Sequence, residues 1–64
     1  MNYAEAIKTL RKKMIISQME FADYLGVSFG TVNRWENDRF TPTIKAKRKL
    51  APLFKKYKIE INDD

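Results

Sequence analysis

Residues 18–37 read QMEFADYLGVSFGTVNRWEN, and this stretch decides the fold. Its apolar residues recur at helical spacing on each side of Gly26, which can adopt at low cost the left-handed backbone conformation that ends a helix. Ser28 stands directly before the second apolar segment, where a helix N-cap is expected. The pattern therefore predicts two short helices, over about residues 18–25 and 29–37, joined by a tight turn.

Each apolar or small residue of this stretch has a mechanical role if two short helices cross at a steep angle. Ala22 must be small because the second helix passes close to it, and Val27 fills the turn. The other inward positions hold large apolar side chains, namely Phe21, Leu25, Val32 and Trp35. Trp35 is thus expected in the core. The residues between the inward positions are mostly polar, so the outer face of the second helix is available to a partner.

The residues before this stretch predict one more helix. Asn2 is a favourable N-cap, and apolar residues then recur at helical spacing up to Met14. We therefore expect a helix over about residues 3–14, followed by a short connection.

The residues after this stretch predict helical structure that a proline interrupts. Thr41 followed by Pro42 is a favourable helix start, because proline is well tolerated at the first helical position. Farther along, Pro52 removes a backbone hydrogen bond. We expect either a kink just before this proline or two helices, over about 42–51 and 52–57.

The chain of 64 residues is short enough for one domain only. The predicted fold class is all-α, a compact bundle of four or five short helices, with the domain over residues 1–58 and a C-terminal tail over 59–64. Residues 58–61 alternate like a strand, but a single short strand has no partner in this chain. We expect residues 62–64 to be frayed.

The composition argues against several classes of function. The chain has no cysteine and no histidine, so disulfides, zinc sites and histidine-based catalysis lack their usual residues. No nucleophile–base pair is visible either, and we expect no metal, no cofactor and no enzymatic activity. The lack of cysteine fits a cytoplasmic location, and no apolar run approaches the roughly 18–20 residues that span a bilayer.

The charge balance favours a polyanionic partner. Lysine and arginine number 13 against 8 aspartates and glutamates, which gives a formal net charge of +5. A basic surface of this kind is typical of proteins that bind nucleic acid or an acidic membrane surface.

The stretch that decides the fold resembles the helix-turn-helix of the phage repressor and Cro group, also called the xenobiotic-response-element (XRE) family. The matching residues are Ser17-Gln18, Phe21-Ala22, Leu25-Gly26-Val27-Ser28, Thr31-Val32 and Arg34-Trp35-Glu36-Asn37, after a basic Leu10-Arg11-Lys12-Lys13. The resemblance covers about residues 5–54. It implies a lambda-repressor-like fold and sequence-specific binding of double-stranded DNA, with the second helix of the motif in the major groove. A prokaryotic or phage transcriptional regulator is the function that it implies.

The resemblance also implies which residues contact DNA. Those expected to face base edges are Phe29, Gly30, Asn33 and Arg34. Those expected to contact phosphates are Gln18, Thr31, Asn37 and Arg39. Arg34 can bind O6 and N7 of guanine with two hydrogen bonds, whereas Gly30 offers no side chain. Arg11 and Glu36 are expected to form a structural ion pair that joins the first helix to the third.

Other interpretations remain open. The chain can be the DNA-targeting or antitoxin part of a larger assembly, which an exposed apolar patch around Phe54, Tyr57 and Ile59 would favour. It can also be a protein-interaction module, for which DNA binding would be weak and insensitive to salt. On DNA we expect a homodimer on two half-sites about one helical turn apart. The last helix and residues 59–61 are the candidates for its seam and for a partner protein.

Overall fold

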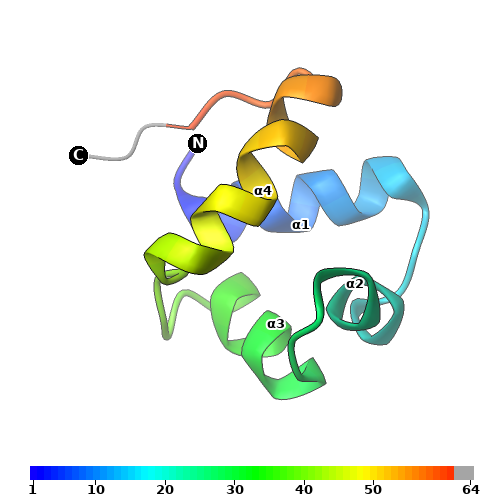
Figure 1. Cartoon of the computed structure of the whole chain (residues 1–64), viewed down its shortest axis with the longest axis vertical. Coiled ribbons are helices and arrows are strands. Elements are labelled where there is room, and N and C mark those ends of the chain that lie inside the picture. The colour runs from blue at the N-terminus through cyan, green and yellow to red at the C-terminus, as the bar shows by residue number, and fades with distance from the viewer. Residues whose placement is uncertain (62–64) are drawn as a thin grey trace.

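The computed structural model describes residues 1–61, and within them the chain forms four helices and no strand (Figure 1). They are α1 (Tyr3–Met14), α2 (Gln18–Leu25), α3 (Phe29–Glu36) and α4 (Ile44–Lys56). The all-α class is confirmed, as are the predicted bounds of α1 and α2, and α3 ends one residue earlier than predicted. None of these four helices is long and apolar enough to cross a membrane. The fraying predicted for residues 62–64 concerns residues outside the described range.

Side-chain caps determine where each helix begins. The cap residues Asn2, Ser17, Ser28 and Thr43 each accept a hydrogen bond from the backbone N–H three residues farther on. At α2 the cap is reciprocal, because the Ser17 N–H also donates to the Glu20 carboxylate over 2.9 Å. This hydrogen bond lowers the pKa of Glu20. It fixes the start of α2 at the point where the connection from α1 arrives.

The core lies between the four helices. α2 and α3 pack on each other, and α1 packs against both α3 and α4 (Figure 1). The largest fully buried side chains are Ile7, Leu10, Phe21, Val32 and Leu50. Trp35 is buried with them, as its helical spacing from Val32 predicted. Because these inward residues turn one side of α3 to the core, its other side is left at the surface.

The start of α4 differs from the prediction, and the continuity of α4 excludes one of the two alternatives for the region of Pro52. The expected start at Thr41 and Pro42 is wrong, since Thr43 is the N-cap and Pro42 lies buried in the preceding loop. The two-helix alternative is also wrong, because α4 continues through Pro52. Proline has no backbone N–H, so the carbonyl of Arg48, four residues earlier, is the one that loses its helical partner. Arg48 is exposed, so water can supply the missing hydrogen bond.

The residues after α4 fold back onto the core and form no strand as far as residue 61. Lys58 turns the chain with a φ of 57°, and the Ile59 N–H donates to the Phe54 carbonyl over 2.8 Å. The side chain of Ile59 is only 7% exposed. The packed core therefore includes Ile59, which the sequence placed in the tail.

Ile15 ends α1 in a backbone conformation that β-branched residues avoid. Its φ of 58° and ψ of 52° lie in the left-handed region, and the residue is 86% exposed, so little packing offsets the strain. This conformation costs a non-glycine residue about 1–2 kcal/mol. We expect Ile15→Gly to raise the free energy of unfolding by about 0.5–1 kcal/mol, because the greater freedom of glycine in the unfolded chain offsets part of the relief.

Urea unfolding followed by the fluorescence of Trp35 measures this gain. Ile15→Ala is the matched control, since alanine removes the same exposed side chain beyond Cβ but keeps the Cβ that causes the strain. It should gain less than Ile15→Gly. Equal stabilities of the two variants would show that the left-handed conformation carries no penalty here.

Candidate nucleic-acid interface

The first turn of α3 presents Phe29, Gly30 and Thr31, three of the residues predicted to contact DNA. Ser28 Oγ accepts from the Thr31 N–H over 3.1 Å and lies 2.9 Å from Thr31 Oγ1. The Thr31 hydroxyl is therefore already engaged with the cap. Phe29 is exposed. This turn thus offers an apolar ring and a small residue at the surface, on a backbone that Ser28 caps.

The side chain of Arg34 lies back along α3 over Gly30. A Cβ on Gly30 would lie 3.3 Å from Arg34 Nη1 and 3.5 Å from Nη2, so the guanidinium would have to shift to admit it. Residues four apart share one side of a helix, and side chains lean toward its N-terminus. The missing side chain thus makes room for the guanidinium. This is a reason for a glycine that costs about 1 kcal/mol of helix propensity against alanine.

Phe40, in the loop between α3 and α4, is a second support for Arg34. The Cζ atom of Arg34 lies 5.5 Å from the centroid of the Phe40 ring, the geometry of a cation–π contact. Phe40 is not among the residues that the sequence predicted to contact DNA. The signal that could have found it is an aromatic residue just after a helix that carries glycine and arginine four residues apart.

Three amide side chains connect α2, α3 and the loop after α3. Asn37 Nδ2 donates to the Asn33 carbonyl over 2.8 Å and to Asn33 Oδ1 over 3.3 Å. Asn33 Nδ2 donates to Gln18 Oε1 over 3.4 Å, and Gln18 Nε2 donates to Glu36 Oε1 over 3.0 Å. Asn33 and Gln18 are half-buried and already hydrogen-bonded within the protein, and each amide keeps a second N–H and a second acceptor lone pair. Their contacts with a base and a phosphate stay predictions.

The expected ion pair between Arg11 and Glu36 is present at the end of this network. Glu36 Oε2 accepts from Arg11 Nε over 2.7 Å, and Oε1 accepts from Arg11 Nη2 over 3.1 Å. Arg11 Nη1 also donates to the Ile16 carbonyl over 3.1 Å. The hydrogen bonding of Arg11 to the Glu36 carboxylate raises the pKa of Arg11 above its ordinary value. The pair ties α1 to the end of α3 and to the connection that precedes α2.

Arg39 lies at the same end of α3 as Arg34. Its backbone N–H donates to the Arg34 carbonyl over 2.9 Å, and the residue is exposed. The single carboxylate of α3, Glu36, is neutralised by Arg11. The surface of α3 therefore presents a guanidinium and amide groups, supported by a second exposed arginine, which suits a polyanion.

The structure brings the predicted residues together in three groups. Arg34 lies beside Gly30 and Arg39, and it also contacts Phe40, which was not predicted. The amides of Gln18, Asn33 and Asn37 form the second group. Phe29 and Thr31 make up the third, at the first turn of α3.

Comparison with known proteins supports one family. A family model described as helix-turn-helix matches residues 7–59, a range that includes α2, α3, α4 and most of α1. No curated protein and no solved structure matches the chain significantly.

Proposed function

The chain belongs to the helix-turn-helix family of Cro- and repressor-like DNA-binding domains, and we propose that it binds double-stranded DNA sequence-specifically with α3 in the major groove. The observation that carries the proposal is the exposed guanidinium of Arg34, supported by Gly30 and Phe40. A guanidinium can bind O6 and N7 of guanine with two hydrogen bonds. The domain would serve a transcriptional regulator of a bacterium, archaeon or phage, acting in the cytoplasm.

Contacts with phosphates supply most of the affinity in this proposal. The net charge of +5 provides attraction that does not depend on sequence. Arg39 and Asn37 are exposed in the loop after α3, where they can reach the backbone of the duplex. Gln18 is the first residue of α2, and the N–H groups of a first helical turn have no partner within the helix. A phosphate can therefore bind the backbone of Gln18 while its side chain stays with Asn33 and Glu36.

The remaining base contacts follow from the first turn and the amide network. Phe29 can contact a thymine methyl group, and Gly30 allows close approach of the backbone to the groove. Asn33 can read adenine, since its hydrogen bond to Gln18 is long, at 3.4 Å, and its amide keeps a second N–H. In this proposal Phe40 is a positioning residue, because it contacts Arg34 and no base.

The burial of the C-terminal residues affects the proposed homodimer and the alternative functions. Phe54 and Ile59 are buried within the monomer and Tyr57 is half-buried. The exposed patch that would favour the DNA-targeting or antitoxin part of a larger assembly is thus largely covered. A homodimer on two half-sites stays a proposal, and these two buried residues do not supply its seam.

Selection of bound sequences from a random pool of duplexes tests the proposed function. We expect a consensus site that the protein binds at least about 1,000-fold more tightly than a scrambled duplex. The logarithm of the affinity should fall with the logarithm of the salt concentration, with a slope of about −0.9 for each phosphate neutralised. Fluorescence anisotropy titrations at several salt concentrations measure both quantities. A pool without enrichment, or an affinity that salt does not change, would contradict the proposal.

A further inference from the structure

An apolar groove lies between the C-terminal end of α2 and the second half of α4. Its volume is about 460 Å³. We call it the α2/α4 groove. It is lined by Tyr24, Leu25, Lys49, Pro52, Leu53 and Lys56. Tyr24 is 62% exposed, so a large aromatic side chain stands open to solvent at its edge. The groove thus combines an apolar lining with two lysines.

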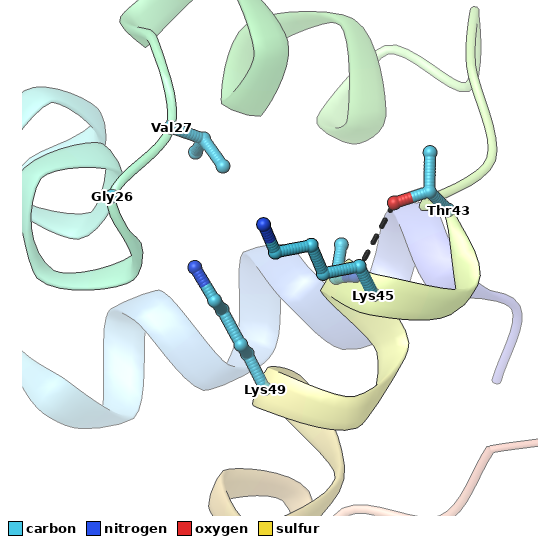
Figure 2. A pocket seen from close by; sticks show the side chains of 6 residues that line it. Gly26, Val27, Thr43, Lys45 and Lys49 are labelled. Atoms are coloured by element: carbon cyan, nitrogen blue, oxygen red, sulfur yellow. Dashed lines mark hydrogen bonds between the residues drawn. The ribbon is translucent and has the colours of Figure 1, made fainter.

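A smaller pocket of about 130 Å³ lies next to the turn between α2 and α3 (Figure 2). Lys49 lines both cavities and joins them. Its Nζ donates to the Leu25 carbonyl over 2.8 Å, which fixes the side chain against the last turn of α2. Figure 2 shows Lys45 reaching from α4 in the same direction, toward Gly26 and Val27. Two lysines therefore border each cavity, Lys45 and Lys49 the smaller pocket and Lys49 and Lys56 the groove.

The charge on this surface has one sign. Among the residues that the structure describes, no carboxylate lines either cavity. α4 contains six basic side chains and no acidic one. An apolar groove with a cationic border is complementary to a protein segment that carries an apolar anchor between carboxylates.

Two other occupants fit this surface less well. Phosphates of DNA would pair with the lysines, but they would leave the apolar side chains of Tyr24, Pro52 and Leu53 without a partner. A second copy of the chain brings a further net charge of +5 to a border that is already cationic. The combination of apolar lining and positive charge therefore favours an acidic protein partner.

We propose that the α2/α4 groove binds an acidic amphipathic segment of another protein. Its aliphatic or aromatic anchor packs between Tyr24 and Leu53, and its carboxylates pair with Lys45, Lys49 and Lys56. The proposal does not rest on the DNA-binding function, since the groove uses the C-terminal end of α2 and the side of α4. The predicted base contacts lie on α3.

A synthetic peptide tests this docking surface on the full chain. The probe is a helix-forming peptide of about 12 residues with a leucine and a phenylalanine four positions apart, flanked by aspartates and glutamates. We expect chemical-shift changes in the ¹⁵N-labelled protein to concentrate at Tyr24, Leu53 and Lys56. Tyr24→Ser and Lys56→Glu should each weaken binding by about five- to tenfold. Both residues are exposed, so the fold should tolerate these substitutions.

Arg48→Glu is the matched control, because Arg48 is exposed on the same helix and does not line the groove. It should weaken binding by less than about twofold, as expected for a charge outside the contact. Equal weakening by Arg48→Glu and Lys56→Glu would overturn the proposal, because the attraction would then be general.

Changes in the peptide test the apolar contact between the peptide and the groove without altering the protein. A peptide whose leucine and phenylalanine are both replaced by serine should bind at least about tenfold more weakly, and equal binding would overturn the proposal. Displacement of the original peptide from the groove by a scrambled duplex would assign the lysines to DNA phosphates instead. Self-association of the protein that Tyr24→Ser abolishes would assign the groove to a second copy. Each of these two outcomes also overturns the proposal.

Discussion

Glu36→Ala should lower the free energy of unfolding by about 3 kcal/mol, near the lower end of the range for removing one partner of a buried ion pair. The Glu36 side chain is 3% exposed and that of Arg11 is 17% exposed. The substitution leaves the Arg11 guanidinium with the Ile16 carbonyl as its acceptor and deprives Gln18 Nε2 of its acceptor. A domain of this size has about 3–10 kcal/mol of stability. After the loss about 0–7 kcal/mol remains, so the variant is largely unfolded at room temperature only if the wild type lies at the lower end of that range.

Urea unfolding followed by far-UV circular dichroism measures this loss. Glu60→Ala is the control, since Glu60 is an exposed carboxylate, and it should change stability by less than about 0.5 kcal/mol. The double variant Arg11→Met, Glu36→Leu removes both charges and should recover at least about half of the loss. If Glu36→Ala is as harmless as Glu60→Ala, the ion pair does not hold α1 to α3.

The first three helices could be predicted because their determinants are local. Asn2, Ser17 and Ser28 cap the backbone three residues farther on, within their own helices. Gly26 ends α2 with a φ of 74°, in the left-handed region that glycine adopts without strain. Signals that act over three or four residues can be recognised without knowledge of the fold.

The course of α4 could not be predicted in the same way, because tertiary packing decides it. Thr41 and Thr43 are equally good caps by local rules, and the burial of Pro42 in the loop shifts the start to Ile44. Leu50 and Phe54, on either side of Pro52, are both buried. Burial of such side chains contributes about 1.5–3 kcal/mol each, enough to keep the helix continuous through a proline.

The candidate site could be predicted as a set of positions but not as a set of contacts. The resemblance placed Gly30 and Arg34 on the exposed face of one helix, and both are on α3. It did not indicate that Phe40 contacts Arg34 or that Gln18 and Asn33 hydrogen-bond to each other. Those contacts join a helix to a loop or to another helix, so they depend on how the helices pack.

Arg34→Ala should lower the preference for the selected DNA site by about 1–3 kcal/mol. Arg34 lies on α3 away from Val32 and Trp35, which face the core, and its guanidinium is exposed. Two hydrogen bonds to guanine are worth about 1–3 kcal/mol against a wrong base. Arg34→Lys should recover little of this, because an ammonium group lacks the planar fork that matches both acceptors. Arg39→Ala should instead weaken binding to every duplex alike, as expected for a phosphate contact.

The deciding measurement is a fluorescence anisotropy titration of the wild type, Arg34→Ala and Arg39→Ala against the selected and the scrambled duplex at one salt concentration. For Arg34→Ala we expect the ratio of the two affinities to fall by roughly 5- to 160-fold, the equivalent of about 1–3 kcal/mol. For Arg39→Ala both affinities should fall by the same factor, so that their ratio stays unchanged. An Arg34→Ala variant that loses both affinities equally, with the ratio unchanged, would contradict base reading by α3 through this residue.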